Sequence, residues 1–172
     1  HNDDSVGLEW GGKQSLNLTT TFQGGELDRE FETHTLDPVK EEMPKPKLKY
    51  DALVKVVTST LFRALKQFHD TTDNVSLEAN SERFSVLGGA EYTKGKVKFD
   101  KGSPNLLEID AGQRGAKATY NLSYLSSMVE GLTKVTDVVS LEFSTNMPLK
   151  IEAILAENIE LRFFLAPRIE AE

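Results

Sequence analysis

Apolar residues recur along the 172-residue chain with two different spacings. Most segments alternate apolar and polar residues with period two, which is typical of strands that bury one face. Segments 59–69 and 123–135 instead place apolar residues three or four positions apart, as one face of a helix requires. The pattern therefore predicts two amphipathic helices, with Ser123 as the N-cap of the second, in a chain made mostly of strands.

The two helices divide the strands into a repeated order. Strands are predicted at 48–56, 74–79, 83–88, 91–100, 105–111, 116–122, 138–143, 149–155 and 159–166. The phrase Val-Ser-Leu-Glu stands at 75–78 and again at 139–142, each time a few residues after a helix. The chain thus uses a unit of strand, helix and three-strand meander twice. Because consecutive meander strands run antiparallel, we predict an α+β fold with both helices on one face of antiparallel sheets.

Glycine and asparagine residues interrupt the alternating segments. Both residue types adopt the backbone conformations that tight turns require. Turns are therefore predicted at Gly88-Gly89, Gly102, Gly112, Asn146 and Glu157-Asn158.

The first 36 residues follow the same alternation but contain no helical pattern. Their predicted strands are 5–10, 14–22 and 27–36. Residues 1–36 are therefore expected to be the C-terminal remnant of a first domain whose earlier part is absent from this sequence. Residues 37–49 contain three prolines, which exclude a central strand and favour an extended inter-domain connector. Residues 50–172 then form the second domain.

Composition removes several classes of function. The chain has no cysteine, which excludes disulfides and cysteine-based catalysis or metal binding. His1, His34 and His69 lack metal-site spacing, and the carboxylates form no clustered pair, so we predict no enzyme activity, no metal site and no cofactor. No apolar run is long enough to cross a membrane, and a net charge of −7 by itself argues against a nucleic-acid partner.

Three stretches give the chain a specific resemblance. They are "LRFFLAPRIEAE" at 161–172, "NMPLKIEA" at 146–153 and "MPKPKLKYDALVKV" at 43–56. With the repeated unit, they resemble the sliding clamps of the proliferating cell nuclear antigen (PCNA) family, in its archaeal form. The resemblance implies the DNA-clamp fold. It also implies a non-catalytic subunit of a three-subunit ring, which encircles duplex DNA as a processivity factor for replication and repair enzymes.

The resemblance implies that the helices line the hole of the ring. Their inward faces should then be basic even in an acidic protein, because DNA carries about one charge per 1.7 Å of axis. The residues implied to face DNA are Arg63 and Lys66 on the first helix and Lys134 on the second, where Glu130 offsets the charge. Such contacts should be non-specific, because nothing in the pattern is shaped to read base edges.

The resemblance also implies an apolar pocket for short peptides of DNA polymerase, flap nuclease, ligase and clamp loader. The implied pocket residues are Met43, Leu48, Tyr50, Met147, Pro148, Phe164, Leu165, Ala166 and Pro167. Phe163 and Phe164 are neighbours in a strand and must point to opposite faces. We therefore expect Phe163 in the core and Phe164 on the pocket side.

Ring closure is implied to pair the edge strand 91–99 with 29–35 of the next subunit. The interface residues would be Arg29, Glu30, Phe31, Glu32, Glu91, Tyr92, Lys94, Lys96, Val97 and Lys98. Opposite charges across the two strands favour this pairing.

Two alternative functions remain at this point: a checkpoint-type clamp subunit, and an extracellular β-rich binding module. A clamp would be cytoplasmic and nucleoid-associated in an archaeon, or nuclear in a eukaryote, with no membrane partner.

Overall fold

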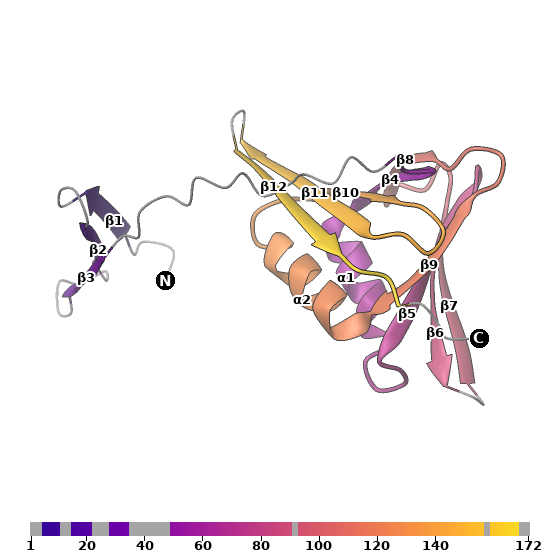
Figure 1. Ribbon diagram of the computed structural model, residues 1–172, viewed down its shortest axis with the longest axis horizontal. Coiled ribbons are helices and arrows are strands. Elements are labelled where there is room, and N and C mark those ends of the chain that lie inside the picture. Colours follow the sequence, from indigo (N-terminus) through magenta and orange to yellow (C-terminus); the bar gives the residue numbers. More distant parts are fainter. Residues whose placement is uncertain are drawn as a thin grey trace. The chain divides into compact units, whose positions relative to one another are not determined.

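The computed structural model divides the chain into two compact units, His1–Pro46 and Lys47–Glu172. The described residues of the first unit form one antiparallel sheet of three strands in the order β1-β2-β3 (Figure 1). These strands are β1 (Ser5–Trp10), β2 (Ser15–Thr21) and β3 (Asp28–His34). They form the meander predicted for the start of the chain. The structure describes residues 5–10, 15–21, 28–34, 49–90, 93–156 and 159–168.

The described residues of the second unit form two helices and two antiparallel sheets, which confirms the predicted fold class. The five-stranded sheet has the order β12-β11-β10-β4-β8, and the four-stranded sheet has the order β7-β6-β5-β9. Figure 1 shows α1 and α2 side by side, on one side of the strands. The strands are β4 (Ala52–Val57), β5 (Asn74–Ala79), β6 (Arg83–Ala90), β7 (Thr93–Asp100), β8 (Leu106–Asp110), β9 (Ala116–Asn121), β10 (Val138–Phe143), β11 (Leu149–Ala156) and β12 (Ile159–Leu165).

The two halves of the repeat exchange strands. β4, which precedes the first helix, pairs with β10 of the second meander, and β9, which precedes the second helix, pairs with β5 of the first. Both copies of Val-Ser-Leu-Glu therefore lie at the junction between halves, with Leu77 and Leu141 fully buried. Each sheet thus combines strands from both halves, which ties the repeat into one domain.

Both helices begin directly after a strand and are shorter than predicted. α1 covers Thr58–Lys66 and α2 covers Leu122–Leu132. The prediction of Ser123 as N-cap is wrong, because the Asn121 side chain accepts a hydrogen bond from the Tyr124 N–H at 3.0 Å. Asn121 is the last, extended residue of β9 and so has the backbone that an N-cap needs. Neither of the described helices has the length and apolarity to cross a membrane.

A pair of glycines makes room for an aromatic ring beside the helices. Gly88 of β6 lies opposite Gly95 of β7, and a Cβ atom on Gly88 would come within 2.6 Å of the buried Phe68 ring. The predicted turn at Gly88-Gly89 is therefore wrong, since β6 continues through both residues. Close packing, not a turn, accounts for the glycine at position 88.

The turns predicted at three other positions are confirmed. Gly102, Gly112 and Asn146 have φ values of 86°, 53° and 57°. Each sits in a turn between two strands, where a positive φ is needed.

Substituting Gly88 tests this packing. We expect Gly88→Ala to lower the free energy of unfolding by about 1–3 kcal/mol, because the added methyl group overlaps Phe68. Urea denaturation of both variants measures the change. Gly131→Ala is the control, since its Cβ meets no atom within 4 Å and alanine favours the helix. Equal stability of Gly88→Ala and the unmodified chain would contradict the packing argument.

Candidate functional site

The exposed side of α1 carries two of the three residues predicted to face DNA. Arg63 and Lys66 are both exposed in the last turn of this helix. The Lys66 ammonium lies over the Phe62 ring, 4.7 Å from the ring centre, and Arg63 Nη2 donates to Thr60 Oγ1 at 3.3 Å. These contacts hold both cations against the helix, so we call this surface the α1 basic face.

The corresponding side of α2 is not basic. Its exposed residues are Ser123, Tyr124, Ser127, Glu130 and Gly131. The placement of Lys134 on this helix is wrong, because α2 ends at Leu132 and Lys134 follows in a turn. The Thr133 hydroxyl closes this end of the helix by donating to the Glu130 carbonyl at 2.7 Å.

A hollow of about 400 Å³ extends the α1 basic face toward β7. Arg63 and Lys98 both line it, and Thr60 Oγ1 donates to Asn105 Oδ1 at 3.0 Å along its wall. No pattern in the sequence indicated this hollow, because Asn105 lies in a turn far from the helix in the chain. The hollow therefore lies between α1 and the edge of β7. Lys98 alternates with the core-facing Val97 and Phe99, so its side chain points to the opposite face of the sheet.

The residues predicted for the peptide pocket gather around the turn between β10 and β11. Ser144 connects this turn to the start of β4, since its Oγ accepts from the Asp51 N–H at 2.8 Å and donates to the Lys49 carbonyl at 3.4 Å. Phe164 of β12 lies opposite Lys150 of β11. We call the following set the turn–tail surface: Tyr50, Met147, Pro148, Phe164, Leu165, Ala166 and Pro167. Met43 and Leu48 lie outside the described residues.

The two phenylalanines of the C-terminal strand point in opposite directions, as alternation predicted. Phe163 packs against the core, whereas 43% of Phe164 is exposed. Leu165 is 8% exposed and belongs to the core more than to the surface. Within the turn–tail surface, Phe164 is thus the large apolar side chain that a ligand would reach first.

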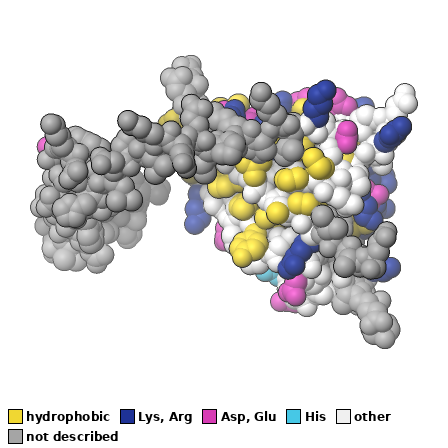
Figure 2. Space-filling model, viewed as in Figure 1, with side chains coloured by type: hydrophobic (Ala, Val, Ile, Leu, Met, Phe, Trp, Pro, Cys, Tyr) yellow, Lys and Arg dark blue, Asp and Glu magenta, His cyan; other side chains and the backbone are white. Residues whose placement is uncertain are grey.

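Further apolar side chains are exposed near the other end of the same two strands. Ile154 is 69% exposed and Ile159 is 54% exposed. In Figure 2, hydrophobic side chains gather on the face of the second unit that shows β12 and α2, with charged side chains mostly around them. The sequence pattern did not predict these exposed residues. Alternation shows which positions are apolar, but it does not show which of those positions lie at the exposed edge of a sheet.

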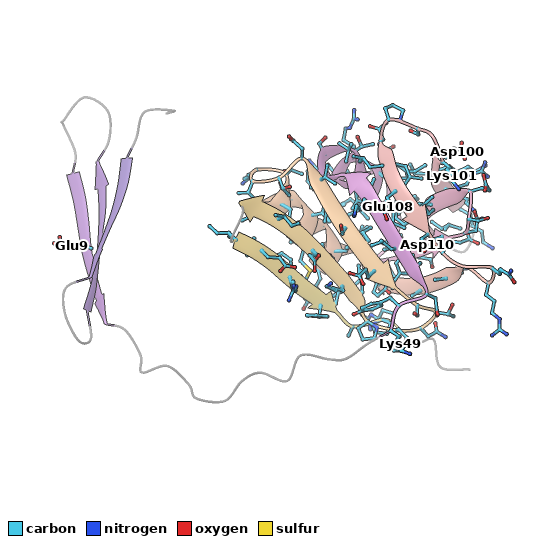
Figure 3. All side chains as sticks on the ribbon, turned by 90° about the horizontal axis from the view of Figure 1, so that it is seen from above. Glu9, Lys49, Asp100, Lys101, Glu108 and Asp110 are labelled. Atoms are coloured by element: carbon cyan, nitrogen blue, oxygen red, sulfur yellow. The ribbon has the colours of Figure 1, made fainter. Side chains whose placement is uncertain are left out.

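A row of charged side chains, joined by ion pairs, crosses the outer face of the five-stranded sheet beside Phe164. Lys150 Nζ lies 2.7 Å from Glu142 and 2.6 Å from Glu152, and Arg162 lies 3.1 Å from Glu152. Figure 3 looks onto this sheet, with Glu108 on β8 at the opposite edge, where it pairs with Lys55. The charged row spans β10, β11 and β12 next to the turn–tail surface.

The ion pairs shift the pKa values of their members. Burial acts to raise the pKa of Glu152, but hydrogen bonds with Lys150, Glu160 and Arg162 outweigh it and lower that pKa. Burial acts to lower the pKa of Lys150, but Glu142 and Glu152 outweigh it and raise that pKa. Burial, followed by the charge of Glu142, raises the pKa of Tyr50.

The strands predicted for ring closure lie at sheet edges. β7 is an edge of the four-stranded sheet and β3 is an edge of the three-stranded sheet. Lys94 and Lys98 are exposed on β7, and Lys96 pairs with Glu78 at 2.9 Å. Val97 packs against the core. Outside the described residues or side chains lie Glu91, Tyr92, Arg29, Glu30, Phe31 and Glu32.

Residues 45–168 match the protein family described as proliferating cell nuclear antigen, C-terminal domain. A DNA polymerase sliding clamp of Thermofilum pendens is 30% identical over 146 residues, which are 85% of this chain and 59% of the relative. A DNA polymerase sliding clamp of Pyrococcus furiosus is 30% identical over 167 residues, which are 97% of this chain and 65% of the relative. The chain thus spans less than two thirds of the length of these relatives.

Solved structures show the same fold. A PCNA crystal structure from Thermococcus kodakaraensis aligns with a TM-score of 0.82 at 22% identity, over 98% of this chain and 67% of that one. A crystal structure of a PCNA2–PCNA3 complex from Sulfolobus tokodaii aligns with a TM-score of 0.81 at 22% identity, over 98% of this chain and 66% of that one. Among the described residues, no group of three or more His, Asp or Glu side chains could hold a metal ion.

The ion pairs make stability depend on pH in a defined direction. The folded pKa of Glu152 lies below its ordinary 4.5, so its contribution is present above pH 4.5 and is lost as pH falls through the folded value. We therefore expect Glu152→Gln to lower the free energy of unfolding at neutral pH, with a deficit that shrinks below pH 4.5. Urea denaturation across that range measures it. Glu130→Gln, on the exposed face of α2, should leave the free energy of unfolding unchanged, and a pH-independent deficit for Glu152→Gln would contradict the assignment.

Proposed function

The chain belongs to the proliferating cell nuclear antigen family of sliding clamps, and we propose that it acts as a subunit of a ring around duplex DNA. One observation carries the proposal: the α1 basic face places Arg63 and Lys66 together on an exposed helix of a protein with net charge −7. A DNA duplex inside a ring would meet its helices. The names of the archaeal relatives, DNA polymerase sliding clamp, support the same function.

The α1 basic face suits contact with phosphates. Arg63 and Lys66 are exposed at the C-terminal end of α1. Neither side chain is arranged to enter a groove and read base edges. The contact would therefore be electrostatic and independent of sequence, as sliding along DNA requires. Lys134 would add charge only from the turn after α2.

The turn–tail surface is proposed to bind short peptides of replication and repair enzymes. Phe164 supplies an exposed aromatic ring, and the half-buried Met147, Pro148 and Pro167 lie on the same surface. A few apolar anchors that enter such a surface supply most of the binding energy of a peptide. DNA polymerase, flap nuclease, ligase and clamp loader are the partners that we propose.

Ring closure is proposed to use the edge of β7. Its exposed Lys94 and Lys98 would face the glutamates of β3 in a second copy.

The proposed domain organisation follows the clamp family: residues 1–36 end a first clamp domain, residues 37–49 connect the domains and residues 50–172 form the second domain. The protein would have no catalytic role and would act in the cytoplasm of an archaeon. The family match over residues 45–168 disfavours an extracellular β-rich module.

Reversing charge on α1 tests the DNA contact. We expect the double variant Arg63→Glu, Lys66→Glu to bind a fluorescent duplex more weakly at low salt, with a log affinity–log salt slope reduced by about one per lost phosphate contact. Lys117→Glu reverses one charge on the exposed face of β9, between the buried Ala116 and Ala118, and should keep the slope. An unchanged slope in the double variant would remove the α1 basic face from the DNA site.

Truncating Phe164 tests the peptide surface. A peptide of the form Gln-x-x-aliphatic-x-x-aromatic-aromatic should bind the chain, and Phe164→Ala should weaken binding by about 2 kcal/mol, since it removes an exposed anchor. Titration calorimetry measures both affinities. Tyr124→Ala removes an aromatic ring that is 65% exposed on α2 and should leave binding unchanged. If the unmodified chain does not bind, the peptide-binding proposal is wrong.

Charge reversal on β7 tests ring closure. Lys94→Glu with Lys98→Glu should shift sedimentation equilibrium toward the monomer, because like charges would then face each other across the paired strands. Lys117→Glu again serves as a control, with one lysine reversed on a different strand. Self-association that survives the double change would place the interface elsewhere.

A further inference from the structure

One strand of the four-stranded sheet is hydrogen-bonded to both sides of the turn–tail surface. The Tyr120 hydroxyl of β9 donates to the Met147 carbonyl at 2.9 Å, and the Thr119 carbonyl accepts from the Arg168 N–H at 2.7 Å. Met147 belongs to the turn between β10 and β11, and Arg168 to the tail after β12. Two consecutive residues of β9 therefore bind the turn and the tail, which both extend from the other sheet.

The turn has little regular structure of its own to fix it. It is closed by the Met147 N–H, which donates to the Ser144 carbonyl at 3.1 Å, and Asn146 reverses the chain with φ 57°. Residues 166–168 follow the end of β12 without regular secondary structure. The bonds from β9 therefore fix the distance between two irregular segments, which both lie at the end of the β11–β12 pair nearest Phe164.

The Tyr120 hydroxyl is positioned to make the hydrogen bond to the Met147 carbonyl. Its side chain is fully buried, and a buried phenolic hydroxyl needs a partner. Removing the hydroxyl would leave the Met147 carbonyl without its Tyr120 donor. The sequence pattern identifies Tyr120 only as a core residue of an alternating strand, because its hydrogen-bond partner, Met147, lies 27 residues away in the chain.

We propose that Tyr120 is a positioning residue, through which β9 holds the turn–tail surface in its binding geometry before a peptide arrives. The inference rests on the proposed peptide binding and adds the residue that pre-organises the surface. Pre-organisation strengthens binding because ordering is not left to the complex. The bond from the Thr119 carbonyl to Arg168 holds the tail in the same way.

The test compares Tyr120→Phe with Ser76→Ala. The first removes only the hydroxyl and keeps the buried ring. The second removes the 2.8 Å hydrogen bond between Ser76 Oγ and Thr119 Oγ1, which joins the same strand to β5 instead of to the surface. We expect Tyr120→Phe to weaken binding of the Gln-x-x-aliphatic-x-x-aromatic-aromatic peptide about three- to tenfold. Ser76→Ala should leave the affinity unchanged, although it too removes a side-chain hydrogen bond of β9.

A second measurement needs no peptide. Amide hydrogen exchange in the free chain should become faster at Met147 in Tyr120→Phe, because the turn has lost its anchor. Peptide binding by the unmodified chain with equal affinity in Tyr120→Phe would overturn the positioning role and leave the proposed function intact. Unchanged exchange at Met147 would also overturn it. If the unmodified chain binds no peptide, the proposed peptide function fails, and this inference fails with it.

Discussion

The second unit depends on one buried apolar layer, which the two helices share with the two sheets. Leu61 and Leu65 of α1 and Leu125 and Val129 of α2 are almost wholly removed from water, beside fully buried residues of both sheets such as Leu141. Burial of such side chains is the main favourable contribution to folding. Once these helix faces are buried, the opposite faces must be exposed. The position of Arg63 and Lys66 therefore follows from the position of Leu61 and Leu65.

Because the two halves of the repeat exchange strands, they share one buried apolar layer. β4 contributes to the sheet of the second meander and β9 to the sheet of the first, so neither half can bury its apolar residues without the other. This arrangement also brings β9 beneath the turn between β10 and β11, where Tyr120 meets Met147. Strand exchange thus provides both the common core and the hydrogen bonds that join one sheet to the proposed peptide surface of the other.

Charged side chains are arranged differently on different faces of the second unit, and the net charge of the chain does not show this arrangement. The chain has net charge −7, yet the described part of α1 presents cations to solvent without a carboxylate in its first turn. The outer face of the five-stranded sheet pairs its charges internally, with Lys150 between Glu142 and Glu152. A surface with satisfied ion pairs contributes little to long-range attraction, whereas exposed cations on a helix act directly on a polyanion. Overall acidity is therefore compatible with the proposed DNA contact.

Periodicity by itself determined the elements of this protein, because a helix or strand shows its buried face in the spacing of its own residues. It predicted the two helices, the antiparallel meanders and the opposite directions of Phe163 and Phe164. The ends of α2 differ from that prediction for local reasons: Asn121 caps the helix in place of Ser123 because β9 ends there, and α2 ends before Lys134. Features that depend on contacts between distant segments leave no such pattern in the sequence. Gly88 is explained only by Phe68, and Tyr120 only by Met147. The tertiary structure decided these features, since each requires two segments that are separate in the chain to meet.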